Sequence, residues 1–357
     1  MNVYVDDCFT PWRRCLEYLG QFEFSKDALN SCDQTAIIFS SESVSGPKFS
    51  TSGENVNFLM AMLMQGINKE EPFLKAKILK DDKDIRLHYR KQQKLGEGSY
   101  GGTFAVVDRR NPVVRLAMKV QTKSCWGSPE EEALRLFREL LILNRILPKH
   151  PNIAQMKDML IGPHNVYILQ ELCSQETLEH FYPVANGVSG CRIFKQLIDA
   201  FNVMHQHGVV HWDVRESNIL FAHSDFMQCK IIDFGQSAYR PEWATKVNDN
   251  FDPRNWFTSE ELAPPPDPNA PHVPKKVDDV RKLGRILHCI MAGKYVPHTL
   301  LGSDAAIQMK TIYRPRVEVF GAQAVSLLRM IGPPPFGPAR DEDLPTIDKI
   351  HQHMWLV

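Results

Sequence analysis

The sequence lacks the features of a membrane-spanning, secreted or strongly charged protein. Its longest apolar runs, such as Phe58–Met64, fall far short of the ~20 residues that a membrane-spanning helix needs. The amino terminus has no basic stretch followed by an apolar one, as a signal peptide would have. Lysine plus arginine and aspartate plus glutamate number 42 each, so the formal net charge is zero. We therefore expect no membrane span, no direct binding of nucleic acid, and an intracellular location in the cytoplasm or nucleus.

The cysteines also lack a pattern. No two of them form a C-x-x-C pair, and the first histidine is His88, so the earlier cysteines have no nearby imidazole for a zinc site. We expect reduced and mostly buried thiols, as is usual for free cysteine, with disulfides or a metal site as the alternatives. The eight positions are Cys8, Cys15, Cys32, Cys125, Cys173, Cys191, Cys229 and Cys289.

A length of 357 residues and an ordinary globular composition allow roughly two or three domains, or one bilobal domain with an extension. Residues 1–84 differ from the remainder, because the segment 39–54 holds six serines, one threonine and two glycines and is typical of a polar, flexible chain. No catalytic pattern occurs in residues 1–84. We interpret them as an N-terminal extension that acts as a tether or as a docking arm for a partner.

From residue 85 onward the pattern changes to strands and then to helices. Strands are expected over residues 85–95, 104–108, 113–121, 166–172, 219–221 and 230–232. Helices are expected over residues 130–147, 192–207, 279–291 and 323–331. Strands followed by helices predict an α+β protein with a small β-rich lobe, about 85–171, and a larger helical lobe, about 174–357.

A glycine cluster follows the first expected strand. Gly96, Gly98 and Gly101 form G-x-G-x-x-G, and glycines there let the backbone turn sharply and bring N–H groups close to phosphate oxygens. A dinucleotide-binding fingerprint would need a helix directly after the glycines, whereas a strand follows here, which disfavours NAD. Taken alone, the motif is equally consistent with a bare glycine turn.

Two charged residues follow at positions where they could meet. Lys119 ends an apolar strand, so its ammonium must reach solvent or find an anion. Glu139 lies on the expected helix 130–147, and a Lys–Glu pair in a cleft would hold the ammonium within reach of phosphates. A surface lysine and a solvated helix face remain the alternative at this point.

The most specific pattern is a polar loop followed by a D-F-G sequence. Asp213 and Asn218 stand in H-x-D-x-x-x-x-N, and Asp233 begins D-F-G. With the glycine loop, Lys119 and Glu139 in the same order, these motifs resemble the eukaryotic protein-kinase family over about residues 85–357. The resemblance implies the bilobal kinase fold, ATP and Mg²⁺ as cofactors, and protein hydroxyls as phosphate acceptors.

The resemblance implies a role for each matching residue. Asp213 would act as the catalytic base that accepts the proton of the substrate hydroxyl. Asn218 and Asp233 would supply oxygen ligands for Mg²⁺. Lys119, paired to Glu139, would position the α- and β-phosphates. A further aspartate, Asp279, begins a later helix and would hold the backbone of the catalytic loop.

The remaining nucleotide contacts also follow from the resemblance. The glycine loop would cover the phosphates, Ala117 would lie over the adenine, and Glu171 and Cys173 would offer hinge backbone groups. Thr103 stands where the family prefers a valine over the adenine ring. Threonine keeps the β-branched shape, so we expect at most a modest loss of contact with the adenine. The implied set is Leu95, Gly96, Glu97, Gly98, Ser99, Tyr100, Gly101, Gly102, Thr103, Ala117, Lys119, Glu171 and Cys173.

Two residues bear on the choice between serine/threonine and tyrosine acceptors. Arg215 lies where serine/threonine kinases usually carry a lysine that touches the γ-phosphate, and its guanidinium keeps the charge but changes the geometry. Arginine at this position occurs in some tyrosine kinases. Thr258 coincides with a threonine that bonds the catalytic aspartate in serine/threonine kinases. We give Thr258 more weight and expect serine/threonine specificity.

The chain departs from the family pattern at two further places. Trp212 replaces the arginine of H-R-D, which in the family usually binds a phosphate on the activation segment through charge-assisted hydrogen bonds. An indole cannot make such bonds, so we expect activity that does not depend on phosphorylation of residues 233–265. Ala263-Pro264-Pro265 replaces A-P-E and removes a tether to an arginine, for which Arg340 is the nearest candidate. A nucleotide-binding pseudokinase that acts as a scaffold is the main alternative, and a small-molecule kinase is a weaker one.

Overall fold

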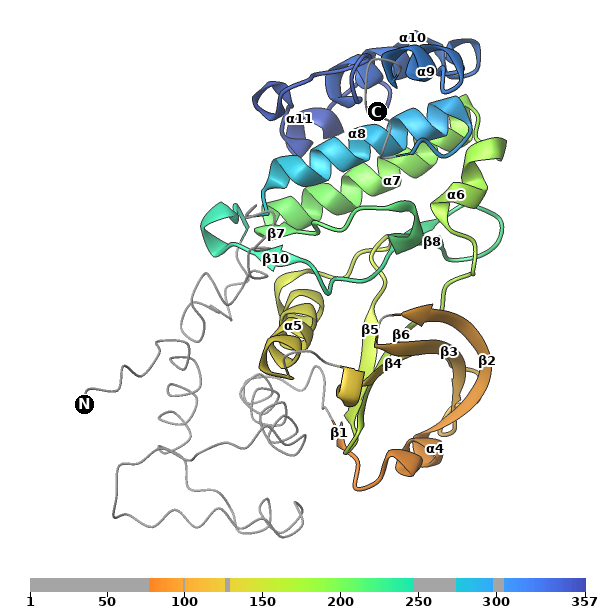
Figure 1. Ribbon diagram of the computed structural model, residues 1–357, viewed down its shortest axis with the longest axis vertical. Coiled ribbons are helices and arrows are strands. Elements are labelled where there is room, and N and C mark those ends of the chain that lie inside the picture. The colour runs from red at the N-terminus through yellow and green to blue at the C-terminus, as the bar shows by residue number, and fades with distance from the viewer. Residues whose placement is uncertain (1–76, 99, 126–128, 247–273, 298–304) are drawn as a thin grey trace, which may run out of the picture.

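The computed structural model describes residues 77–98, 100–125, 129–246, 274–297 and 305–357. The described chain forms two lobes, one built on a β-sheet and the other on helices (Figure 1). The predicted α+β, bilobal architecture is therefore confirmed.

The small lobe contains a six-stranded sheet with the order β1-β5-β6-β4-β3-β2. All neighbouring strands are antiparallel except β1 and β5, which are parallel. The sequence predicted neither β1 nor β5. Strand β1 is only two residues long, and the second half of β5 is buried on both faces, so its residues do not alternate between buried and exposed. The strands are β1 (Lys77–Ile78), β2 (Tyr89–Gly98), β3 (Gly101–Asp108), β4 (Arg115–Thr122), β5 (Met156–Ile161) and β6 (Asn165–Glu171).

Residues 77–84 pack onto this sheet. Leu79 is buried in the core of the small lobe. The Asp82 carboxylate accepts hydrogen bonds from the Tyr167 hydroxyl and the His164 N–H, both at 2.9 Å. A 3-10 helix (Asp82–Asp84) and the short helix α4 (Ile85–His88) then lead into β2, where a strand was expected from residue 85. The sheet lobe thus already includes Lys77, ahead of the expected boundary at residue 85.

Helix α5 (Pro129–Leu141) continues into a π-helical turn (Ile142–Ile146) and matches the expected helix 130–147. Its middle packs on the sheet, because Leu136 and Leu140 belong to one buried cluster with residues of β5 and β6. Its end packs elsewhere, because Leu141 and the π turn belong to the core of the helical lobe. One helix therefore contributes to both cores.

The helical lobe is built around two long neighbouring helices, α7 and α8 (Figure 1). Asn186 caps the start of helix α7, because its side chain accepts the N–H groups of Val188 and Ser189. The expected helices at 192–207, 279–291 and 323–331 correspond to α7, α8 and α10. The helices are α6 (Leu178–Phe181), α7 (Gly187–Gln206), α8 (Lys276–Ala292), α9 (Ala305–Thr311), α10 (Val317–Ile331) and α11 (Ile347–His351).

Two short antiparallel strand pairs lie where the helical lobe faces the sheet lobe. The pair β8–β9 confirms the two strands expected at 219–221 and 230–232. Because the chain runs from β7 to β8 and from β9 to β10, these pairs hold both ends of the two polar loops that the sequence singled out. The strands are β7 (Val209–Val210), β8 (Ile219–Phe221), β9 (Cys229–Ile231) and β10 (Ala238–Tyr239).

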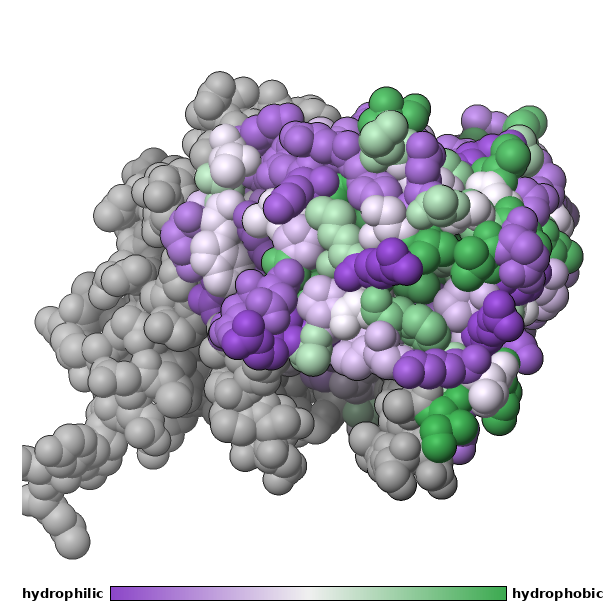
Figure 2. Space-filling model, turned by 90° about the horizontal axis from the view of Figure 1, so that it is seen from above, coloured by the Kyte–Doolittle hydropathy of each residue, from purple (hydrophilic) through white to green (hydrophobic). Residues whose placement is uncertain are grey.

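Seen from the helical-lobe end, the surface mixes polar side chains with small apolar patches (Figure 2). The cysteines within the described residues are all free thiols. No helix in the described part of the chain is long and apolar enough to cross a membrane.

Candidate active site

One carboxylate on α8 anchors the backbone of the loop between β7 and β8. Asp279, on α8, is fully buried and accepts the backbone N–H groups of His211 at 3.0 Å and Trp212 at 2.9 Å. The His205 imidazole nitrogen lies 3.0 Å from the same carboxylate. A buried carboxylate with this many donors is well compensated for its lost hydration. The expected role of Asp279 in holding the loop backbone is confirmed.

Trp212 adopts an unusual backbone conformation within this anchor. Its φ of 64° lies in the left-handed region, which is uncommon for a residue other than glycine. Helix α8 holds both of its backbone groups, since Asp279 accepts its N–H and the Lys282 ammonium donates to its carbonyl. The unusual backbone conformation of Trp212 is therefore held by contacts of both its backbone groups with α8.

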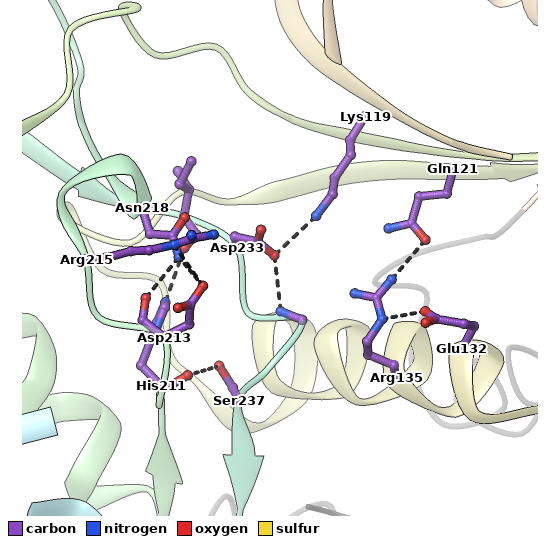
Figure 3. A network of polar contacts seen from close by, with 12 residues as sticks. Lys119, Gln121, Glu132, Arg135, His211, Asp213, Arg215, Asn218, Asp233 and Ser237 are labelled. Carbon is purple, nitrogen blue, oxygen red and sulfur yellow. Dashed lines mark hydrogen bonds and ion pairs between the residues drawn. The ribbon is translucent and has the colours of Figure 1, made fainter. Parts of the chain in front are cut away.

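The loop brings three of the predicted residues together (Figure 3). The Asn218 amide nitrogen donates to the Asp213 carboxylate at 2.7 Å and to the Asp213 carbonyl at 2.9 Å. The Arg215 guanidinium lies 3.1 Å from the same carboxylate. The Asp213 side chain keeps 30% of its surface exposed, so it is both oriented and reachable by a substrate.

The D-F-G aspartate meets the predicted lysine across the space between the lobes. The Lys119 ammonium of β4 lies 3.1 Å from the Asp233 carboxylate, which also accepts the Gly235 N–H at 3.3 Å (Figure 3). Burial acts to raise the pKa of Asp233, but the Lys119 charge and these hydrogen bonds outweigh it and lower that pKa. Asp233 is therefore an ionised oxygen donor beside Lys119.

The expected ion pair between Lys119 and Glu139 is replaced by this Lys119–Asp233 pair. Glu139 is fully buried, and neither of its carboxylate oxygens makes a hydrogen bond of good geometry among the described residues; the Phe234 backbone N–H lies close enough to act against the effect of burial on its pKa. Burial therefore raises the pKa of Glu139, although the nearby Lys119 charge opposes the shift. The two carboxylates compete for one ammonium, and in this arrangement Asp233 has it.

A network that the sequence did not reveal lies beside this cluster. Arg135, one helical turn before Glu139, contacts Glu132 at 2.6 Å and Gln121 of β4 at 3.1 Å (Figure 3). The Tyr100 hydroxyl of the glycine loop donates to Glu132 at 2.5 Å. The network joins α5, β4 and the glycine loop. The sequence signal for its ion pair was the three-residue spacing of Glu132 and Arg135, which places them on one helix face.

The glycines of the loop differ in what the fold demands of them. Gly101 has a φ of 148°, and a Cβ there would lie 2.5 Å from the Val120 carbonyl, so the fold itself requires glycine. A Cβ on Gly96 would meet no described atom within 4 Å, and one on Gly98 only the Gly101 carbonyl at 3.4 Å. Packing therefore does not explain Gly96 and Gly98, and the space beside them suits phosphate oxygens. Ser99 lies outside the described residues.

The predicted adenine-side residues lie along the sheet and the link between the lobes. Ala117 pairs with Gln170 of β6, Thr103 pairs with Lys119, and Gly102 pairs with Glu97. Leu95 lies in β2, the edge strand beside β3. Glu171 ends β6, and its carboxylate is bound to Lys230 at 2.7 Å. Burial, and then the Glu171 charge, raise the pKa of the Cys173 thiol to about 11, so the thiol stays protonated.

The donor set fits a magnesium ion carried with phosphates. Because the Asn218 nitrogen donates to Asp213, its amide oxygen is the atom left to bind a cation, as is the Asp233 carboxylate. Magnesium is usually held by one or two carboxylates plus substrate phosphates. No group of three or more His, Cys, Asp or Glu side chains in the described ranges is arranged to hold a metal by itself.

Other predicted features fall outside this site. Thr258 and Ala263–Pro265 lie outside the described residues. Arg340, the candidate partner of the missing A-P-E glutamate, is exposed and contacts Glu342 at 2.7 Å and Asp343 at 2.9 Å.

Comparison with known proteins agrees with this geometry. Residues 89–325, more than half of the chain, match the family model of the protein kinase domain. The chain belongs to the eukaryotic-type protein kinase family. The resemblance expected from the five motifs is therefore confirmed.

Several similar relatives are plant and animal kinases. Calcium-dependent protein kinase 8 of Arabidopsis thaliana is 30% identical over 46% of this chain and 32% of its own length. Calcium-dependent protein kinase 20 of Oryza sativa subsp. japonica is 29% identical over 59% of this chain and 37% of its own. The human serine/threonine-protein kinase ULK3 is 27% identical over 43% and 32%. The chain thus spans about a third of the length of these relatives.

A solved structure supports the fold. The twitchin kinase region from C. elegans matches with a TM-score of 0.56 and 19% identity, over 86% of this chain and 51% of that chain.

Proposed function

We propose that this kinase-family protein is an active serine/threonine protein kinase that transfers the γ-phosphate of ATP to hydroxyls of protein substrates. One observation carries the proposal. Asp213, Asn218, Asp233 and Lys119 come from three separate segments and two lobes, yet their side chains converge on one space. The serine/threonine assignment is supported by the names of relatives such as ULK3.

In this proposal Asp213 acts on the acceptor hydroxyl. Its carboxylate is fixed by Asn218 and Arg215, so it can accept a hydrogen bond from an acceptor hydroxyl and orient that oxygen in line with the γ-phosphate. As the new oxygen–phosphorus bond forms, the bond from the γ-phosphorus to the β-phosphate oxygen breaks. ADP leaves, and the hydroxyl proton passes to Asp213.

The phosphates would be held from both lobes. Lys119 would contact the α- and β-phosphates, while Arg215 lies on the acceptor side. Asn218 and Asp233 would hold Mg²⁺, which when bound neutralises part of the phosphate charge. Because Lys119 now contacts Asp233, we propose that nucleotide binding shifts the ammonium toward the phosphates and toward Glu139.

The test is transfer of γ-phosphate from Mg-ATP to a basic protein and to a degenerate Ser/Thr/Tyr peptide mixture. Wild type and Asp213→Asn run side by side. We expect incorporation on serine and threonine that falls by at least about 100-fold in the variant. Incorporation confined to tyrosine would reject the serine/threonine assignment.

A pseudokinase is the second candidate, and the lone Glu139 carboxylate favours it. No transfer by wild type, together with a rise in melting temperature on addition of Mg-ATP, would establish this alternative. The role expected for residues 1–84, a tether or docking arm, remains a prediction, because residues 1–76 lie outside the described residues.

A further inference from the structure

A cavity of about 270 Å³ lies beside the link between the lobes, and Glu171, one of the predicted hinge residues, is part of its lining. Its wall is formed by the segment after the π turn of α5, the start of β5, the end of β6 and β9. None of the catalytic side chains of the proposed mechanism lines it. The lining residues used below are Lys149, His150, Gln155, Lys157, Glu171 and Lys230.

The cavity carries an excess of positive charge. Three lysines line it and only one carboxylate, so the net charge is +2 with His150 neutral. The carboxylate is already committed: Glu171 binds Lys230 at 2.7 Å and lies 3.4 Å from the Gln155 N–H. The Lys230 side chain keeps only 8% of its surface exposed, so this pair forms a fixed floor rather than a mobile surface contact.

The other two lysines lack an opposite charge. Lys149 and Lys157 are exposed, and neither forms an ion pair within the described part of the chain. Lys157 donates to the neutral side chain of Gln155 at 2.7 Å. Because both lysines line one cavity, their like charges are unfavourable for each other, and an anion bound there would offset them.

His150 adds a neutral donor to the same wall. Its Nδ1 accepts the Asn152 N–H at 3.2 Å, so the proton of the neutral ring is on Nε2. Burial, and the positive charge of Lys230, lower the pKa of His150 and keep it neutral, although Asp199 opposes the shift. The imidazole can therefore donate a hydrogen bond without adding a charge to the cavity.

We propose that this cavity binds a phosphate dianion, presented either by a phosphorylated side chain or as free phosphate. A charge of −2 matches the net charge of the lining. Three terminal oxygens match separate donors on Lys149, Lys157 and His150, whereas a carboxylate offers two oxygens in one plane. The cavity has room for the phosphate and for part of the group that carries it. This site does not depend on phosphoryl transfer, so it stands whether or not the protein is an active kinase.

The test compares the double variant Lys149→Met/Lys157→Met with a control of equal charge change, Lys310→Met/Lys349→Met. The control lysines are exposed on α9 and α11, away from the cavity. Calorimetric titrations of the full chain use a phosphoserine peptide, its unphosphorylated form and inorganic phosphate. Any phosphate binding in the active site is common to both variants and cancels in the comparison.

We expect the phosphoserine peptide to bind the control as it binds wild type, and to bind the Lys149/Lys157 variant at least about tenfold more weakly. Lys149→Arg/Lys157→Arg should retain binding. A phosphopeptide that binds far more tightly than inorganic phosphate identifies a phosphorylated side chain as the source, and equal affinities identify free phosphate. The proposal is overturned if no phosphate probe binds, if both double variants bind equally, or if the unphosphorylated peptide binds as well. Unchanged melting temperatures exclude unfolding as the cause.

Discussion

Two fully buried carboxylates on opposite sides of the active site have opposite surroundings. Asp279, in the helical lobe, receives two backbone N–H groups and an imidazole. Glu139, on α5, makes no hydrogen bond of good geometry among the described residues, and the Phe234 backbone N–H lies near it as a donor. The helical-lobe half of the site is therefore already assembled, whereas the sheet-lobe half holds a charge that only a change in partner can satisfy. If the proposed function is right, nucleotide binding would complete the sheet-lobe half and would find the helical-lobe half already formed.

The largest effect should come from the satisfied carboxylate. Asp279→Asn places an NH₂ group against donors that need an acceptor, so we expect a loss of about 3 kcal/mol in the free energy of unfolding. Urea denaturation measures it, and Glu318→Ala, which removes an exposed carboxylate from α10, is the control. A loss below about 1 kcal/mol would show that the anchor contributes little.

A second buried contact of the helical lobe should be nearly as sensitive. Glu216, three residues after Asp213, binds Arg285 of α8 at 2.7 Å and accepts the Tyr182 hydroxyl at 2.9 Å. Arg285→Met leaves this buried carboxylate without its counter-charge and should cost about 3 kcal/mol in unfolding free energy. Adding Glu216→Gln should recover part of the loss. Strictly additive losses would refute the coupling of these two residues.

On the sheet-lobe side, the effect should be smaller. Tyr100→Phe removes one hydrogen bond to the Glu132 carboxylate, and we expect a cost of about 1 kcal/mol in stability. Thermal unfolding measures it, with Tyr313→Phe as the matched variant. An equal change in both variants would mean that the link between the glycine loop and α5 contributes nothing.

Replacing the buried Glu139 carboxylate should change the stability least at low pH and should increase it at higher pH. Burial raises the pKa of Glu139 above the ordinary 4.5, so the folded state binds the proton more tightly than the unfolded state. Below 4.5 the protonated group carries no penalty, and stability is lost as the pH rises through the folded-state pKa. Glu139→Gln should therefore match wild type in acid and be more stable near neutrality.

Melting temperatures of both proteins across this pH range test the prediction. A variant less stable than wild type at neutral pH would mean that Glu139 is already paired, and the contrast with Asp279 would fail. Phosphate transfer should still fall in Glu139→Gln, because the proposed mechanism uses Glu139 to hold Lys119 once nucleotide is bound.

The motifs and the fold could be predicted because they depend on residue type and order. Asp279 was assigned correctly because its partners are backbone groups of a loop whose position the family pattern fixes. The present partner of Lys119 could not be predicted, because Glu139 and Asp233 are chemically alike and the position of α5 decides between them. That position depends on the packing of Leu136 and Leu140 against β5, a strand whose residues gave no alternating signal. The lysine-lined cavity could not be predicted either, because it brings Lys230 of β9 against residues 149–157 and Glu171, which lie far from it in sequence.

Helix α5 has one further consequence. Leu136 and Leu140 belong to the core of one lobe, whereas Leu141 and the π turn belong to the core of the other. Glu139 lies at this boundary, so the segment that carries it is attached to the cores of both lobes. We expect any rotation between the lobes to be converted into a turn of α5, which moves the Glu139 carboxylate relative to Lys119. The distance between these two side chains would then report directly how far the lobes have closed.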